Sequence, residues 1–371
     1  MLSMKEKNNQ KGPSKGHKKA THGSKTLCTS LHNPLSNMLS ITERRRSFKY
    51  GDQSNSGSGS IYEYEDCLIG LIDDLSLVCC GNYLGKQMTM KEVVRSSVGV
   101  MGESPLGMTE KVVLLKSQMF ALKRFRKTIV HRTEFGKRVE KLAQVSKKCE
   151  YLVPIAAYLY TKRIKFILYD YYPMGSLADL LAGGRKYGHT ALNWNQRLKI
   201  ILDVARGIEF IHKQNPNGRK TKMNVHGNIK SSNIMINIDL SACLSDYGFT
   251  QLAERVEVPG KRQVKPPQVP AYNIYCEELS QKGDIFNFGV VIMDILAGSR
   301  FPTFKRLIVE MKEDIKEGKV DFFEFDLDPR ERMRASQILD IALGCISQPP
   351  GGRPSIEQVL LFIGDVIIKE T

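Results

Sequence analysis

The residues best suited to chemistry lie in two short blocks, Asn224–Asn233 (NVHGNIKSSN) and Leu244–Gly248 (LSDYG). Asp246 and Asn233 carry oxygen atoms of the kind that bind magnesium, which phosphoryl transfer requires on the phosphates. Lys230 can neutralise charge on the transferring group. The amide of Asn228 cannot accept a proton, although a positioned base contributes about 10²–10⁴-fold to such reactions. The blocks therefore predict metal-binding groups without a proton acceptor. A polar turn whose asparagines bond the backbone is the alternative.

A glycine-containing stretch could cover a nucleotide. Val100–Gly107 has Gly102 and Gly107 at the spacing of a G-x-G-x-x-G phosphate loop, but Ser104 replaces the middle glycine and Pro105 follows it. A side chain there crowds the backbone approach to phosphate, and proline removes an amide donor. A plain hairpin turn is the competing interpretation.

Met119–Phe125 is predicted to be a strand that carries Lys123. Ala121 precedes Lys123 in an A-x-K context, and a lysine held on a strand could contact a phosphate group. An exposed surface lysine is the alternative.

Charge is concentrated at the N-terminal end of the 371-residue chain, whose net charge is +16. Residues 1–60 hold eleven Lys or Arg and three acidic residues, half of that excess, and their composition predicts a disordered basic tail. The eight cysteines show no C-x-x-C spacing, so we expect reduced thiols and a cytoplasmic location, with association at the inner face of the plasma membrane left open. No apolar run is long enough to span a bilayer.

Periodicity places the other elements along the chain. Strands are expected at Tyr151–Tyr160, Ile164–Tyr171, Ile234–Ile238 and Ala242–Leu244. Leu68–Cys80 fits either a strand or a short helix. Helices are expected at Met90–Ser97, Thr133–Lys147, Asn193–Lys213 with an Asn193/Gln196 capping box, Gly283–Ala297 ended by Gly298, Phe304–Lys316, Ala335–Ile346 and Ser355–Ile368, with Ser176 as the N-cap of another.

Taken together, these motifs resemble those of eukaryotic protein kinases, and specifically plant receptor-like kinases of the leucine-rich-repeat type with an HGN catalytic loop. The resemblance rests on HGNIKSSN and DYG, on the connector Tyr169–Leu177 (YDYYPMGSL) and on Ser280–Val291 (SQKGDIFNFGVV). It implies an α+β, bilobal fold: a kinase-like domain at 88–366 with an N-lobe at about 88–170 and a C-lobe at about 171–366, after an uncertain extension at 61–87. No membrane span is recognised ahead of the domain.

The resemblance also implies residue roles. Gly102, Gly107, Ala121, Lys123, Asn233 and Asp246 would hold ATP, with Asn233 and Asp246 on magnesium, while Asn228 takes the place of the catalytic base beside Lys230. Asp284 would brace the catalytic loop, and Glu277 would pair with Arg353. Active kinases pair the strand lysine with a helix glutamate, but Arg138 occupies that position here. Glu134, one turn earlier, could replace it, or Lys123 could turn to Asp246.

These departures predict a pseudokinase that binds ATP and magnesium weakly or not at all and acts as a scaffold or allosteric partner of other receptor kinases. A weakly active Ser/Thr kinase is the second hypothesis, because positioning and electrostatics supply most of this catalysis. In the third, the basic tail binds nucleic acid or anionic lipid, and aromatic residues are too few there to favour nucleic acid.

Overall fold

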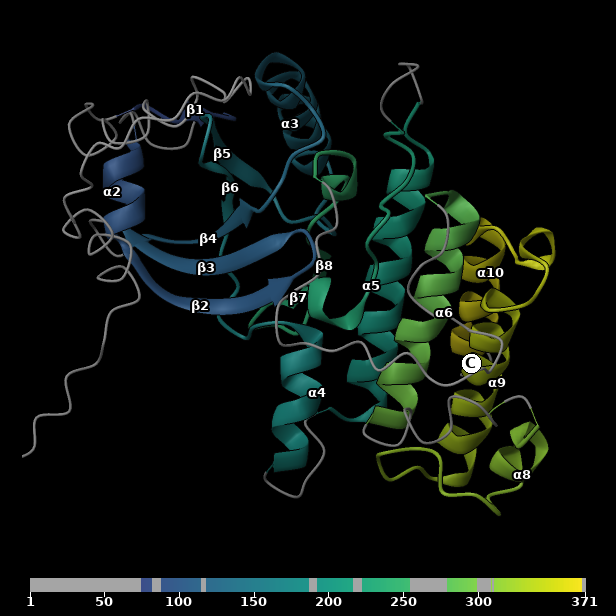
Figure 1. Ribbon diagram of the computed structural model, residues 1–371. Coiled ribbons are helices and arrows are strands. Elements are labelled where there is room, and N and C mark those ends of the chain that lie inside the picture. Colours follow the sequence, from purple (N-terminus) through teal and green to yellow (C-terminus); the bar gives the residue numbers. More distant parts are fainter. Residues whose placement is uncertain are drawn as a thin grey trace, which may run out of the picture. The chain divides into compact units, whose positions relative to one another are not determined.

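The computed structural model shows a β-rich lobe followed by a helical lobe (Figure 1). The α+β bilobal prediction is confirmed. The structure describes residues 75–81, 88–114, 118–186, 192–215, 222–253, 279–298, 308 and 310–368. The basic tail at 1–60 and Glu277 lie outside these residues.

One antiparallel sheet forms the first lobe, with the strand order β1-β5-β6-β4-β3-β2. Its strands are β1 (Val78–Cys79), β2 (Ser97–Ser104), β3 (Gly107–Leu114), β4 (Gln118–Phe125), β5 (Ile155–Tyr160) and β6 (Lys165–Asp170). Only the end of the ambiguous Leu68–Cys80 stretch is described, and there it is an edge strand on β5.

Alternation along β4 decides which side chains reach the interior between the lobes. Phe120 and Leu122 pack in one cluster with Val93 of helix α2 (Met90–Arg95). Ala121 and Phe125 pack in the other cluster, with helix α3 (Arg132–Ser146). Because side chains alternate across a strand, Lys123 shares the face of Ala121 and Phe125.

The second lobe is built from helices, and its two most extensively buried helices, α5 (Trp194–His212) and α6 (Gln281–Ala297), pack against each other. The other helices are α4 (Leu177–Lys186), α8 (Lys312–Lys316), α9 (Pro329–Cys345) and α10 (Ile356–Ile368). A two-stranded sheet, β7 (Ile234–Ile236) and β8 (Ala242–Leu244), carries the two sequence blocks at its ends. The predicted Asn193/Gln196 capping box opens α5, Ser176 caps α4 through Asp179, and Gly298 ends α6.

Several predicted boundaries were wrong. The strand expected from Tyr151 begins at Ile155, and the strand expected to reach Ile238 ends at Ile236. The helix expected from Ala335 begins at Pro329, because Asp328 and Glu331 form a capping box around a proline at the first turn. Within the described part of Phe304–Lys316, only α8 is helical, and Met311 is its N-terminal flanking residue.

Candidate functional site

Lys123 is buried beneath the β2–β3 hairpin and is surrounded by oxygen atoms of this chain. Its side chain is only 4% exposed. Its Nζ lies 3.0 Å from Asp246 Oδ2, 3.3 Å from Ser104 Oγ and 3.3 Å from Thr109 Oγ1. A lysine ammonium has three N–H donors, so these three neighbours match its full donor capacity. The surface-lysine alternative is therefore excluded.

Tyr169 extends this buried group of polar residues. It pairs with Ala121 across β4 and β6, and its hydroxyl forms a hydrogen bond with Thr109. Burial, and secondarily the nearby Asp246 carboxylate, raise the pKa of Tyr169 well above its ordinary value, so the phenol stays protonated. We call Lys123, Ser104, Thr109, Asp246 and Tyr169 the lysine cluster. Sequence reasoning did not identify Thr109 and Tyr169, because their involvement depends on strand register.

The glycine-containing stretch forms a closed hairpin between β2 and β3. Ser104 donates from Oγ to the Gly107 carbonyl at 3.1 Å, across the turn at Pro105 and Leu106. Gly107 is required by packing, since a Cβ there would lie 1.9 Å from the Arg124 carbonyl oxygen. The hairpin-turn interpretation thus describes the geometry. The Ser104 hydroxyl points to Lys123, on the side where phosphates would have to approach.

Arg138, on α3, does not approach Lys123 as a like charge. Its Nη1 donates to the Gln251 carbonyl at 2.9 Å, and its Nε donates to Glu134 Oε1 at 2.7 Å. The alternative pairing of Glu134 with Lys123 is therefore wrong, and the alternative with Asp246 is confirmed. Arg138 instead joins α3 to the segment that follows the DYG block.

That following segment, Phe249–Ala253, is held at several points that the sequence did not reveal. The Gln251 side chain accepts from the Lys222 amide at 2.7 Å and donates to the Lys222 carbonyl at 2.9 Å. The Ile129 amide donates to the Leu252 carbonyl at 3.0 Å. A single glutamine has no sequence signature for such a role, which depends on the loops meeting in space.

Asp284 braces the catalytic loop as the resemblance implied. Its carboxylate accepts from the backbone amides of His226 at 2.7 Å and Gly227 at 2.8 Å, and it lies 3.1 Å from His212 Nε2. Asn233 Nδ2 donates to the Asn228 carbonyl at 2.8 Å, which ties the two ends of the loop together. The loop therefore keeps a defined geometry around Asn228.

Position 227, next to His226, is shaped for glycine. Gly227 has a φ of +78°, which disfavours other residues, and a Cβ would lie 2.4 Å from Leu279 Cδ1 and 2.7 Å from Thr250 Oγ1. A larger side chain could fit only if these neighbours moved. Asn228 and Lys230 are both half-buried on the same loop.

Two buried ring side chains, His226 in the loop and Tyr247 in the DYG block, are held in uncharged forms. His226 is fully buried, and burial lowers its pKa; its Nδ1 accepts from the Asn228 amide at 3.2 Å, so Nε2 carries the proton. Tyr247, the central residue of the DYG block, donates its hydroxyl to the Met223 carbonyl. Burial raises its pKa above the ordinary range.

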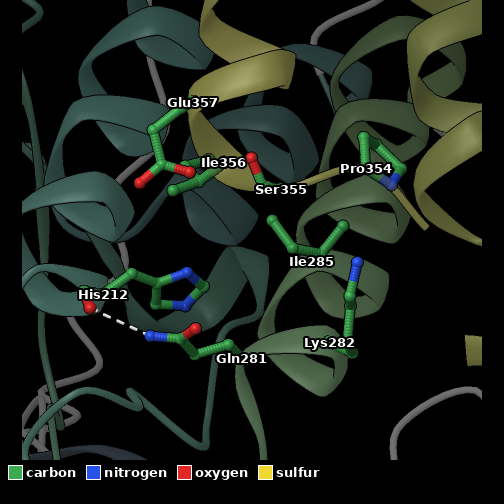
Figure 2. Close-up of a pocket in the computed structure, with 8 residues that line it drawn as sticks. All are labelled: His212, Gln281, Lys282, Ile285, Pro354, Ser355, Ile356 and Glu357. Carbon is green, nitrogen blue, oxygen red and sulfur yellow. Dashed lines mark hydrogen bonds between the residues drawn. The ribbon is translucent and has the colours of Figure 1, made fainter. Parts of the chain in front are cut away.

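A separate cavity of about 80 Å³ lies on the helical lobe (Figure 2). His212, Gln281, Lys282, Ile285 and Pro354–Glu357 line it, and Gln281 donates to the His212 carbonyl at 2.9 Å. Because His212 also contacts Asp284, this cavity adjoins the brace of the catalytic loop rather than the lysine cluster.

The oxygen atoms expected to hold magnesium fit that ion in part. Asp246 Oδ2 is buried and is paired with Lys123 Nζ at 3.0 Å, and the Asn233 side-chain oxygen accepts no hydrogen bond from the described residues. The described residues contain no group of three acidic, histidine or cysteine side chains that could hold a metal. A cation would thus need nucleotide phosphates as further ligands, whereas Lys123, which would hold them, has its donors directed to protein oxygens.

The comparisons with known proteins agree with this geometry. Residues 98–363 match the family model for protein tyrosine and serine/threonine kinases. The chain belongs to this family. A probable inactive receptor kinase of Arabidopsis thaliana is 31% identical over 76% of this chain and 43% of its own length. An inactive leucine-rich-repeat receptor-like serine/threonine kinase of the same plant is 29% identical over 87% of this chain and 47% of its own length. The chain spans less than half the length of these relatives.

Solved structures show the same fold. The pseudokinase domain of BIR2, an immune regulator of the RLK/Pelle family, matches with a TM-score of 0.61 at 22% identity, over 80% of this chain and 91% of that one. The kinase domain of maize SIRK1 bound to AMP-PNP matches with a TM-score of 0.63 at 24% identity, over 78% of this chain and 99% of that one. The resemblance to plant receptor-like kinases is confirmed. Among the described residues no helix has the length and apolar character to cross a membrane.

Proposed function

We propose that this protein is a catalytically inactive receptor-like kinase that acts as a scaffold or allosteric partner of other receptor kinases in the cell. The observation that carries the proposal is the braced loop around Asn228. Asp284 and Asn233 hold that loop by backbone and side-chain hydrogen bonds, so the base position is well formed but is filled by an amide. An amide cannot take the proton of an attacking hydroxyl.

Weak or absent nucleotide binding is part of the proposal. Gly102, Gly107, Ala121 and Lys123 would line the ATP site, with Asn233 and Asp246 on magnesium, and bound ATP would supply the phosphoryl group. To engage phosphates, Lys123 must give up its contacts with Ser104 and Thr109, and this cost lowers affinity. The closed β2–β3 hairpin acts in the same direction.

Residues that hold the lobes together support a scaffold rather than a switch. Arg138 joins α3 to Gln251, and Gln251 joins the same segment to the backbone of Lys222. These contacts are made between groups of this chain alone, so they hold the lobes in one arrangement. A partner kinase would therefore meet a constant surface.

A weakly active kinase is the second candidate, favoured by one observation. Asp246 is a buried carboxylate whose Oδ2 is paired with Lys123 Nζ at 3.0 Å, and Asn233 lies on the neighbouring loop. Carboxylate and amide oxygens are ligands that a divalent cation prefers, so a cation bound with nucleotide could take the place of the ammonium beside Asp246. If nucleotide and cation bind together, Lys230 and the positioned groups of the loop could support slow transfer without a base.

Transfer of labelled phosphate from ATP separates the two candidates. The native chain, Asn228→Asp and Lys123→Met are compared with magnesium and with manganese. We expect a silent native chain, and gain of activity in Asn228→Asp would show a competent pocket that lacks only its base. Native transfer that Lys123→Met abolishes would overturn the proposal in favour of the slow kinase. Transfer that survives Lys123→Met would point to a contaminating kinase.

A further inference from the structure

The N-lobe carries a large excess of positive charge. Residues 88–170 contain seventeen Lys or Arg and seven acidic residues, a net charge of +10, which exceeds that of the basic tail. The surplus is not spread evenly. Arg126–Arg132 (RKTIVHR) and Thr161–Lys165 (TKRIK) each contain three Lys or Arg and no acidic residue.

The fold brings these two segments together. Arg126–Arg132 connects β4 to α3, and Thr161–Lys165 is the turn between β5 and β6. Tyr160, which ends β5, reaches the connection: its hydroxyl donates to the Val130 carbonyl at 3.1 Å and lies 3.4 Å from Thr128 Oγ1. The Tyr160 ring packs on Phe135 of α3 at 5.1 Å between centroids. Two stretches about thirty residues apart thus form one surface.

An exposed apolar side chain lies in this surface. Ile129 is 57% exposed although its amide is fixed by the Leu252 carbonyl. Lys127, Arg132, Lys162 and Arg163 are exposed, and Lys165 is half-buried. We define the basic face as Lys127, Ile129, Arg132, Lys162, Arg163 and Lys165.

We propose that the basic face contacts an anionic lipid bilayer. Long cationic side chains attract acidic headgroups, and an exposed isoleucine among them can enter the boundary with the acyl chains. Recognition of a phosphorylated peptide typically relies on guanidinium groups in bidentate geometry. The cations here are mostly lysines, distributed over a loop, a helix start and a turn, which suits a diffuse anionic surface better than a single phosphate.

The expected loss of vesicle binding follows from the number of cations removed. A Lys or Arg near an anionic membrane surface contributes about 1 kcal/mol, which is about fivefold in binding. Lys162→Glu with Arg163→Glu removes two such contributions and adds repulsion. We expect this double variant of the full chain to bind phosphatidylserine-containing vesicles at least about 25-fold more weakly than the native chain.

The matched control is Lys91→Glu with Arg95→Glu on α2, which makes the same charge change in the same lobe at two exposed positions. Sedimentation is measured with vesicles of phosphatidylcholine alone and with phosphatidylserine, at rising sodium chloride. We expect the control to bind like the native chain. Equal weakening of both double variants would overturn the proposal, because attraction would then follow net charge, including that of residues 1–60. Circular dichroism establishes that each variant is folded.

A second readout tests the contact directly. The chain has one tryptophan, Trp194, which is 2% exposed. Ile129→Trp therefore adds a single surface indole, whose emission should shift to the blue with phosphatidylserine vesicles and stay unchanged with phosphatidylcholine. No shift with either vesicle would refute bilayer contact at Ile129. Binding of the native chain to an acidic phosphopeptide but not to anionic vesicles would assign the face to a protein partner and refute the lipid proposal.

Discussion

Releasing Lys123 from its own hairpin should increase the affinity of this protein for ATP. The perturbation is Ser104→Gly combined with Thr109→Val. The first change restores the glycine of the phosphate loop and removes one hydroxyl that accepts from Lys123 Nζ. The second removes the other hydroxyl and keeps the side-chain volume close to that of threonine, directly opposite Lys123 in the β3–β4 register. Asp246 stays as the ionic partner.

The magnitude follows from the two contacts that a nucleotide must now displace. Both measure 3.3 Å, which is long for a hydrogen bond, so we assign each about 1 kcal/mol rather than the larger values of charged pairs. Losing both competitors should strengthen binding by about 2 kcal/mol, or about 30-fold in the dissociation constant. The Tyr169 hydroxyl loses its Thr109 partner in the variant, which will lower stability somewhat.

Titration calorimetry with AMP-PNP and magnesium measures the change. Ser97→Gly is the matched control, since it also replaces a serine of β2 but one whose hydroxyl donates to Glu110 at 2.8 Å. We expect the control to bind like the native chain. If the double variant keeps a cooperative unfolding transition and its dissociation constant stays within about threefold of native, against the 30-fold expected from the two contacts, then the lysine cluster is not what limits nucleotide binding.

Two further predictions concern the loops around the site. Arg138→Ala removes a charged donor from the Gln251 carbonyl, so amide exchange in Phe249–Ala253 should accelerate about fivefold to 30-fold, whereas exchange in the exposed neighbour variant Lys137→Ala should match native; equal exchange in both would refute the role of Arg138. Burial lowers the pKa of His226 in the folded protein below its ordinary 6.5. At pH values between the two pKa values the unfolded chain therefore binds more protons than the folded protein. The free energy of unfolding should be full above about pH 6.5 and should fall at lower pH by up to about 1.4 kcal/mol per pH unit. Denaturant unfolding across this range should show the slope in native protein and in His131→Asn, an exposed position, but a smaller slope in His226→Asn.

Local patterns were sufficient for most of the fold. The Asn193/Gln196 capping box, the end of α6 at Gly298 and the strand carrying Lys123 were predicted correctly, because each depends on residues within a few positions of one another. The helix that begins at Pro329 could also have been predicted. Its Asp-Pro-x-Glu start is a capping signal that received too little weight against the apolar run further along.

The sequence alone determined that position 228 carries no base and that the blocks follow the order found in kinases. Asn228 cannot act as a base in any fold, and the order of the blocks identified the kinase resemblance. Only the tertiary structure decided what Lys123 and Arg138 do instead. The partners of Lys123 lie on three separate elements, so choosing between Glu134 and Asp246 required the distance between α3, β4 and the DYG block. Helical periodicity gives the face on which a residue lies, but the separation of two faces is set by how the whole core packs.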